Sequence, residues 1–329
     1  MTHDRSAARP AAEPGLGAPR TISGLGFALV SAASFGLSGT LARGLLDTGW
    51  SPGAVTLIRI GLAAALVAPF GLAALHGRWH LLGRSAGTIL AYGSFAVAGA
   101  QFCYFSAVQY MQVAPALLIE YTAPVAVVLW LWLRHAQRPS RMTVLGIAVA
   151  ILGLVLVVGL VSGTQVSVAG TLWALGAMVG CSVYFLLSAD DGRGLPPLTL
   201  AAGGLVVGTA LLGLLAVVGL LPITVVDVPA AYSGVEVAWW IPLLLLGLVT
   251  AAIAYTSGIA AIRRLGSRVS SFVGLTEVLA ALGWAWLLLA ELPSTVQLLG
   301  ALLIVLGVVA VKLGERPAAA QPFDAIPPA

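Results

Sequence analysis

The sequence predicts an all-α integral membrane protein in which ten transmembrane helices form two inverted five-helix repeats, with both termini cytoplasmic. Composition is the first observation: of 329 residues, 60% are hydrophobic and only 9% are charged, against about 25% charged in a soluble domain. Ten long apolar segments are the second observation, and an internal repeat is the third. Because so few charges cannot cover a water-facing surface, the bilayer is the expected solvent of this chain.

Ten apolar segments are long enough to cross a bilayer, since a helix needs about 20 residues to span roughly 30 Å of hydrocarbon. Their continuous apolar character favours helices over barrel strands, which alternate over about ten residues. In chain order the segments cover residues 22–42, 52–75, 86–108, 113–133, 142–161, 168–189, 197–221, 237–262, 269–290 and 295–311. The longest connecting loop, 222–236, is expected outside the cell, and no soluble domain is expected.

Lys and Arg residues define the predicted orientation, since positively charged loops stay in the cytoplasm. With the N-terminus inside, 14 of the 16 basic residues fall on the inner side, whereas Arg43 falls in an outer loop and Arg59 within a span. Both termini are therefore expected in the cytoplasm. Residues 22–42 are not expected to be a cleaved signal peptide, because the apolar run is too long and no small-residue cleavage site is evident.

The expected domains follow from the spans and the tails. Residues 1–21 and 314–329 are rich in Ala and Pro and are expected to be disordered cytoplasmic tails. Residues 22–161 form the first predicted five-helix repeat, and residues 168–313 form the second.

An internal repeat appears when the sequence is shifted by 154 residues without a gap. Trp, Pro-Ser and Leu-Gly patterns then align in register. The aligned residues are Trp130, Trp132, Pro139, Ser140, Gly146 and Gly153 with Trp284, Trp286, Pro293, Ser294, Gly300 and Gly307. Five spans in each half is an odd number, so the halves must run in opposite orientations, as in many secondary transporters. Substrate is expected near the midplane, between the halves.

Two groups of residues carry a resemblance to a known family. The first comprises Ala107, Val108, residues 113–118 and Pro124; the second comprises Ala261, Ile262, residues 264–266, Glu277, residues 289–291, Gln297, Gly300 and Gly307. Over residues 22–313, the chain resembles the EamA-type family of the drug/metabolite transporter superfamily. The run Leu-Ile-Glu-Tyr-Thr-Ala-Pro at 118–124 resembles the threonine/homoserine exporter branch, which implies efflux of amino acids or related metabolites. The family usually has Pro where this chain has Val278, so any hinge at that point is not implied.

Charged residues deep inside the spans are the candidate site. A charge at the bilayer centre costs about 2.5–3.5 kcal/mol on insertion scales, and Arg59, Glu120 and Glu277 fall at such positions. By helix rise, Arg59 and Glu120 each lie about 10 Å from the outer boundary, with Gln101 at a comparable height. We hypothesise that Arg59 binds a carboxylate while Glu120 binds an amino group or a coupling proton. The alternatives are a structural ion pair between Arg59 and Glu120, or an Arg59 side chain that extends outward to the interface.

Pro124 and Glu277 complete the predicted site. Pro124 has no N–H for the carbonyl of Glu120, so it is a predicted structural hinge. Glu277 lies about 12 Å from the inner boundary by helix rise and is, with Glu120, a candidate for proton coupling; the alternative is a protonated carboxyl bonded to a neighbouring helix. Glu291 is expected to be a solvated cap. The predicted substrate-binding residues are Arg59, Gln101, Tyr104, Glu120, Tyr184 and Tyr255.

The expected function is a secondary transporter of the cell membrane that exports small metabolites such as amino acids by alternating access, with or without proton coupling. Multidrug or cation efflux, an uncoupled facilitator, a membrane scaffold and an intramembrane enzyme are the alternatives. No catalytic set and no phosphate-binding loop is evident, so we expect no enzyme. No cofactor and no metal site is expected: Cys103 and Cys181 lie in apolar runs, and His76 and His80 lack further ligands. The expected partners are a small-molecule substrate and the lipid bilayer, without nucleic acid; a monomer and a homodimer both fit.

Overall fold

The computed structural model describes residues 18–123, 125–126, 140–158, 167–188, 194–258, 260–261, 264, 273, 276–292 and 294–314. These residues form α-helices, two π-helical segments and one β-hairpin. The helices of the first half are α1 (Ala18–Leu46), α2 (Pro52–Ala73), α3 (His80–Arg84), α4 (Ala86–Ala91), η1 (Tyr92–Gly99, π), α5 (Ala100–Tyr110), α6 (Val113–Glu120) and α8 (Arg141–Val158). Those of the second half are α9 (Val168–Ser188), α10 (Pro197–Val217), α11 (Trp240–Gly247), η2 (Leu248–Ile253, π), α13 (Thr276–Leu289) and α14 (Thr295–Gly314).

Five helical segments within the described ranges are long and apolar enough to span a membrane. They are Ile22–Leu46, Pro52–Ala73, Ala86–Tyr110, Pro197–Val217 and Trp240–Gly258, and shorter apolar helices lie at Arg141–Gly153, Val168–Tyr184, Thr276–Leu289 and Leu298–Ala310. Large apolar side chains such as Phe70, Leu214 and Val217 point out of the bundle and are exposed. Exposed apolar surface of this extent is unfavourable in water and favourable against lipid.

Several predicted boundaries differ from the observed ones. Helix α1 begins at Ala18, so its first turn includes the end of the predicted tail, and it continues to Leu46, which puts Arg43 in the last helical turn and not in a loop. Helix α6 ends at Glu120, although the sequence predicts one span over 113–133. Pro124, Trp130 and Trp132 lie outside the described residues.

Two buried apolar clusters form the interior. The larger cluster joins α1, α5, α6, α8, α9, α13 and α14, and the smaller joins α2, η1, α10 and η2. Helix α2 contributes to both, through Val55 in the larger cluster and Ile60 in the smaller. The stretch of α2 between these two residues, which carries Arg59, therefore lies where the two clusters meet.

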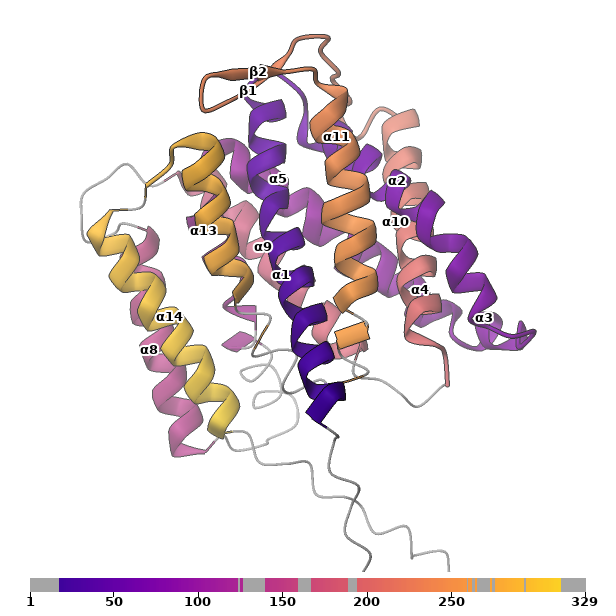
Figure 1. Cartoon of the computed structure of the whole chain (residues 1–329), viewed down its shortest axis with the longest axis horizontal. Coiled ribbons are helices and arrows are strands. Elements are labelled where there is room, and N and C mark those ends of the chain that lie inside the picture. The colour runs from indigo at the N-terminus through magenta and orange to yellow at the C-terminus, as the bar shows by residue number, and fades with distance from the viewer. Residues whose placement is uncertain are drawn as a thin grey trace, which may run out of the picture.

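Helices α8 and α14, which carry the aligned glycines of the two repeats, pack side by side and antiparallel (Figure 1). A Cβ atom at Gly153 would lie 2.6 Å from the Gly300 carbonyl oxygen, and one at Gly307 would lie 2.6 Å from the Gly146 carbonyl oxygen. The aligned residues thus contact each other reciprocally. Only glycine allows the backbones so close an approach, which explains the Gly pattern in both repeats.

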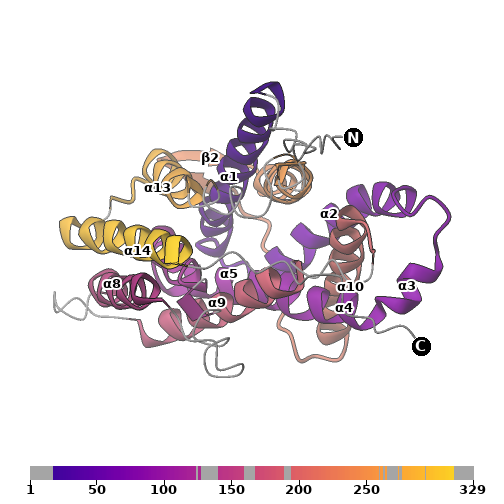
Figure 2. The same cartoon turned by 90° about the horizontal axis from the view of Figure 1, so that it is seen from below.

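Helices α2 and α10 form a second antiparallel pair on the opposite side of the molecule (Figure 2). The space beside Gly53 is filled by Leu221, that beside Gly61 by Thr209, and that beside Gly71 by Ala202. Residue numbers on α10 therefore fall as those on α2 rise. Because α2 and α10 are the second helices of the two halves, and α8 and α14 the last ones, these corresponding helices are inverted relative to each other.

Contacts between the halves follow the same exchange. Segment η1 packs on α9 and on α10, and η2 packs on α1 and on α2. Each π-helical segment therefore contacts the first two helices of the other half. The two π-helical segments occupy equivalent positions in the repeat, since a shift of 154 residues places residues 94–99 on Leu248–Ile253.

The loop predicted to be external contains the described β-structure. Strands β1 (Ala230–Tyr232) and β2 (Val235–Val237) pair antiparallel, with Ala230 opposite Val237. Ser233 and Gly234 turn the chain with φ angles of 48° and 82°, as a two-residue hairpin of this hand requires. The Tyr232 hydroxyl donates a 2.7 Å hydrogen bond to the Leu41 carbonyl of α1. The hairpin therefore ties this end of α1 to the second half, a local exception to the all-α prediction.

Candidate functional site

Arg59 is a fully buried cation in the first half of α2. Its position depends on the start of the helix, where Ser51 accepts from the Ala54 N–H and Pro52 occupies the first turn, as helix starts favour. The side chain is 1% exposed, so it does not extend outward to the interface. Its guanidinium carbon lies 5.2 Å from the centre of the Phe105 ring, within the range of a cation–π contact.

Two polar partners hold the Arg59 guanidinium. Nη1 donates to the Gln101 side-chain oxygen, and Nη2 donates a 2.9 Å hydrogen bond to the Thr250 carbonyl of η2. The remaining nitrogen, Nε, is buried without a hydrogen-bond partner among the described residues. The ion pair found within the described residues joins Arg43 to Asp47; Arg59 and Glu120 do not form one. The positive charge of Arg59 is thus solvated by neutral groups.

The Thr250 carbonyl that accepts from Arg59 belongs to the π-helical segment η2. A π turn bonds i to i+5 instead of i to i+4, which shifts the register of the backbone hydrogen bonds and occurs frequently at functional sites. Thr250 itself is buried, and its hydroxyl donates back to the Leu246 carbonyl at 2.8 Å. The second half of the chain therefore contributes a backbone acceptor to a cation of the first half.

Glu120 is the last residue of α6 and is 9% exposed. The Tyr121 and Thr122 N–H groups bond to the Leu117 and Ile119 carbonyls, a tightened end that is typical of a helix terminus. Pro124 would supply no N–H to the Glu120 carbonyl, which agrees with a helix that stops here. The predicted hinge at Pro124 lies outside the described residues.

Glu277 faces the first half from the start of α13. The Tyr121 hydroxyl donates a 2.6 Å hydrogen bond to Glu277 Oε2, a short bond of the kind that charged acceptors form. Gly36 of α1 lets the two backbones approach, since a Cβ atom there would lie 2.9 Å from the Glu277 carbonyl. Glu277 is therefore bonded to a tyrosine that the sequence analysis did not single out.

The buried charges interact with one another as one cluster. Arg59 interacts electrostatically with both carboxylates, and Glu120 interacts with Glu277. Helix rise alone places Glu277 nearer the inner boundary, apart from Arg59 and Glu120 nearer the outer one. Three phenols, Tyr104, Tyr121 and Tyr255, interact electrostatically with these charges as well.

The three predicted site tyrosines lie in different surroundings. Tyr104 is buried beside Phe105, with ring centres 5.6 Å apart, and its hydroxyl occupies the space beside Gly39 of α1. Tyr255 makes an edge-on contact with Phe35 of α1 at 5.0 Å. Tyr184 lies 5.9 Å from the Tyr92 ring and packs against the smaller apolar cluster. Tyr104 and Tyr255 thus adjoin the charge cluster.

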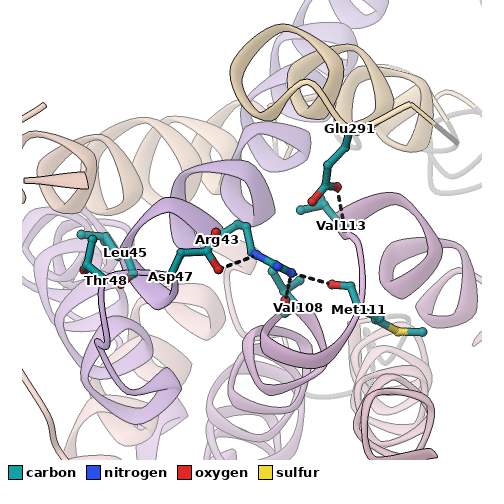
Figure 3. Close-up of polar contacts among 8 residues, drawn as sticks. All are labelled: Arg43, Leu45, Asp47, Thr48, Val108, Met111, Val113 and Glu291. Atoms are coloured by element: carbon teal, nitrogen blue, oxygen red, sulfur yellow. Dashed lines mark hydrogen bonds and ion pairs between the residues drawn. The ribbon is translucent and has the colours of Figure 1, made fainter. Parts of the chain in front are cut away.

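A second polar group lies at the end of α1 (Figure 3). Arg43 donates from Nε to Asp47 at 2.8 Å and from Nη1 to the Val108 and Met111 carbonyls at 2.7 Å and 3.1 Å. Glu291, which follows α13, accepts from the Val113 N–H at 3.3 Å. Burial raises the pKa of Glu291 above its ordinary range, and the Val113 bond opposes this shift. Glu291 therefore caps the start of α6, a helix of the other half, instead of its own helix.

Three contributors to the site were missed by the sequence analysis: Tyr121, Phe105 and the Thr250 carbonyl. Tyr121 follows Glu120 directly and could have been found as a phenol next to a buried acid. Phe105 lies four residues after Gln101 on α5, a spacing that puts both on one face. The Thr250 carbonyl leaves no side-chain signal. No group of three His, Cys, Asp or Glu side chains with metal-binding geometry occurs in the described part of the chain.

A helical membrane protein with two related, partly inverted halves and a buried cluster of opposite charges has the kind of architecture that many secondary transporters use. The sequence profile described as the EamA-like transporter family matches the chain twice, over residues 22–159 and 168–313. The chain belongs to this family, as its sequence motifs predict, and carries a duplicated EamA domain. It is a multi-pass protein of the cell membrane and a transporter of the drug/metabolite class.

Curated relatives and a solved structure extend the comparison. The chain is 25% identical over 278 residues to the threonine/homoserine exporter RhtA of Salmonella typhimurium strain LT2, and 25% identical over 277 residues to that of Escherichia coli strain K12. Both alignments cover 82% of this chain and 85% of the relative. One solved crystal structure matches with a TM-score of 0.56 and 21% identity, covering 90% of this chain and 96% of the other; this match shows the fold alone.

Proposed function

We propose that the protein exports small amino-acid-like zwitterions by alternating access between two inverted five-helix halves. In this proposal ten spans cross the membrane, residues 22–161 and 168–313 form the halves, and both termini are cytoplasmic. Labelling of single cysteines in the two tails and in the loop 222–236 tests the topology. Tails on one side and the loop on the other are expected, and tails on opposite sides would contradict the proposal.

The buried charge of Arg59 is the observation that carries the proposal. Its charge has no carboxylate partner among the described residues, and its Nε is buried and unbonded. A buried cation without a direct ion-pair partner is costly, so it is retained where it serves a ligand or a transport pathway. A substrate carboxylate supplies an acceptor for Nε and a direct ion-pair partner for the guanidinium. We therefore assign Arg59 to the substrate carboxylate, with Gln101 and the Thr250 carbonyl as its supports.

Glu120 and Glu277 provide the complementary acids. They interact electrostatically with Arg59 and with each other, so the cluster holds one base and two acids. A zwitterion that binds Arg59 through its carboxylate brings its ammonium group toward an acid. The second acid is then available for a coupling proton, since a carboxylate that has lost its neighbouring cation binds a proton more readily. Tyr104 and Tyr255 border this cluster, and Tyr184 is assigned to its periphery.

The relatives favour amino acids over cationic drugs as the cargo. Both are named for export of threonine and homoserine, and a cationic drug that carries no acid offers no carboxylate to Arg59. The proposal therefore names threonine-sized amino acids as the first substrates to test.

Export from cells is the direct test of the function. Cells with and without the gene are fed threonine-containing peptides, and the medium is compared for amino acids. Arg59→Leu and Glu120→Gln are expected to abolish the excess threonine in the medium at unchanged protein level. Arg84→Leu, a substitution of the same kind at an exposed position, is the control and is expected to export normally. Normal export by both site variants would refute the assignment of the site.

Proton coupling is tested separately in right-side-out vesicles. An imposed pH gradient is expected to accelerate threonine export by the wild type and to leave the Glu277→Gln variant unaffected. If the pH gradient does not change the rate of wild-type export, the coupled mechanism is refuted and the protein is an uncoupled facilitator.

A further inference from the structure

Tyr121 connects the two halves of the chain through a bond to an acid. It lies one residue beyond the end of α6 in the first half, and its hydroxyl donates to Glu277 Oε2 of α13 at 2.6 Å. Helices α6 and α13 also pack directly against each other. Any motion that separates the two helices must therefore lengthen or break this hydrogen bond.

The strength of the hydrogen bond between Tyr121 and Glu277 depends on the charge state of Glu277, which its surroundings influence. Helix α1 approaches through Gly36, which has no side chain, so α1 offers no charge there. The titratable and charged groups that interact with Glu277 come from α2, α5, α6 and the segment after η2. They are Arg59, Tyr104, Glu120, Tyr121 and Tyr255.

We propose that Tyr121 is a positioning residue that holds α6 against α13 while Glu277 is ionised and releases α13 when Glu277 is protonated. A neutral phenol can donate one O–H, and a bond to a carboxylate is roughly twice as strong as a bond to a neutral acceptor. Protonation of Glu277 consumes one proton from water on the side to which the site is open. Tyr121 keeps its own proton throughout, so no other group gains or loses one.

A bound substrate would also affect the hydrogen bond between Tyr121 and Glu277. This part of the inference rests on the proposed function. The ammonium group of a bound amino acid competes with the Tyr121 hydroxyl for the Glu277 oxygens. Either a proton or a substrate then weakens the same bond between the halves. Tyr121 thereby makes the inter-helix contact dependent on the occupancy of Glu277.

A second phenol of the chain is a matched control. Tyr232 also donates one hydrogen bond across the halves, to the Leu41 carbonyl at 2.7 Å, but a backbone carbonyl cannot be protonated in this pH range. Loss of either hydroxyl removes one hydrogen bond. Only the loss of the Tyr121 hydroxyl is expected to change how the molecule responds to pH.

Thermal unfolding of the purified protein without substrate tests the inference independently of transport. The wild type is expected to melt a few degrees above Tyr121→Phe at alkaline pH, with the difference shrinking as the pH falls and Glu277 is protonated. In a Glu277→Gln background, the Tyr121→Phe substitution is expected to give a difference that does not change with pH. Tyr232→Phe is expected to lower the melting temperature equally at every pH. A pH-independent difference for Tyr121→Phe would overturn the inference.

Threonine transport in proteoliposomes provides the second readout. Tyr121→Phe is expected to shift the pH profile of the transport rate at unchanged protein level. Adding Arg59→Leu to Tyr121→Phe is expected to abolish transport, as it does in the wild type. Absence of threonine transport by the wild type, together with the expected melting behaviour, would refute the proposed function and leave Tyr121 as the pH-dependent contact. Wild-type transport with an unshifted profile in Tyr121→Phe would refute the inference alone.

Discussion

At the residue scale, Arg59 is held by neutral acceptors from both halves. Gln101 of α5 and the Thr250 carbonyl of η2 accept from its two terminal nitrogens, and neither cancels its charge. Hydrogen bonds from a buried guanidinium to neutral oxygens fix its direction without forming an ion pair. The positive charge therefore stays available to a ligand in a low-dielectric environment, where such interactions are stronger than in water.

Replacement of Gln101 by Glu tests this interpretation. The new carboxylate would take the place of the Gln101 side-chain oxygen that accepts from Arg59 Nη1. It would then form an ion pair with Arg59 and neutralise its charge. We expect Gln101→Glu to reduce threonine export at least tenfold while the protein accumulates normally. Gln109→Glu, the same change at an exposed position of the same helix, is expected to export like the wild type. Unimpaired export by Gln101→Glu would show that the free charge of Arg59 is not needed.

Glu291 gives a pH-dependent prediction outside the spans. Burial raises its pKa in the folded protein, partly offset by the Val113 N–H and Arg43. A carboxyl whose folded pKa is raised binds its proton more tightly when folded, so its contribution to stability is present at low pH and is lost as the pH rises through that pKa. Glu291→Gln keeps an acceptor for Val113 and removes the titration.

Melting curves from acidic to neutral pH check this prediction. The stability of Glu291→Gln relative to the wild type is expected to increase as the pH rises. Glu236→Gln, at an exposed position of the hairpin, serves as the control. Parallel curves for the wild type and Glu291→Gln would contradict the expected linkage.

Helix rise predicts that Arg59, Gln101 and Glu120 lie at similar depths, and among the described residues Arg59 bonds to Gln101 but forms no ion pair with Glu120. Equal depths of Arg59 and Gln101 follow from sequence spacing and straight helices, and the two side chains are bonded. The Thr250 carbonyl could not be predicted, because a π turn changes backbone register without a recognisable side-chain pattern. The capping role of Glu291 could not be predicted either, because its partner Val113 is 178 residues away.

At the element scale, α1 contacts site residues of both halves. Phe35 meets the Tyr255 ring, Gly36 meets the Glu277 carbonyl, and Gly39 leaves space for the Tyr104 hydroxyl. These positions lie within about one helical turn of each other. Gly36 and Gly39 let α1 pack closely against the residues of the charge cluster.

Gly36→Ala is the test of this role for α1. The added Cβ would lie 2.8 Å from the Ala281 nitrogen and 2.9 Å from the Glu277 carbonyl oxygen, so α1 and α13 must separate. Overpacking of this kind costs about 1–3 kcal/mol, and we expect a lower melting temperature and impaired export. Gly26→Ala, on the same helix with no atom within 4 Å of the new Cβ, is the control. Equal behaviour of the two variants would contradict this role.

The sequence predicted the helical character of the apolar segments more accurately than the residues at which the helices begin and end. Long apolar runs and short polar loops predict helices correctly because the bilayer leaves the backbone few alternatives. Helix α6 ends at Glu120, and Ala123, Val125 and Ala126 are again helical; the rest of the span predicted over 113–133 lies outside the described residues. The hairpin at Ala230–Val237 was predicted only as a loop, since its register depends on a Ser-Gly turn and on contacts with Leu41 of α1.

At the scale of the whole molecule, the repeat seen in the sequence becomes a reciprocal packing. Gly153 contacts the Gly300 backbone as Gly307 contacts the Gly146 backbone, and the aligned positions differ by the same 154 residues. Such an arrangement predicts equal energetic roles for the two glycines. The sequence could predict the repeat but not which helices pair across it, because pairing depends on contacts between distant spans.

Parallel substitutions test this equivalence. Gly153→Ala and Gly307→Ala each add a Cβ that would approach backbone atoms at 2.6 Å, and we expect both to lower the melting temperature by similar amounts. Gly213→Ala in α10, with no atom within 4 Å of the new Cβ, is expected to be neutral. A strong effect of only one of the two substitutions would contradict the reciprocal packing.

Counterflow of labelled threonine in proteoliposomes tests the central claim most directly, because it isolates the recognition of a carboxylate by Arg59. Uptake of labelled threonine into vesicles loaded with unlabelled threonine is expected for the wild type and not for Arg59→Leu. Homoserine, which has the carboxylate, is expected to compete, and threoninol, which lacks it, is not. Equal competition by threoninol, or wild-type counterflow by Arg59→Leu, would contradict the account.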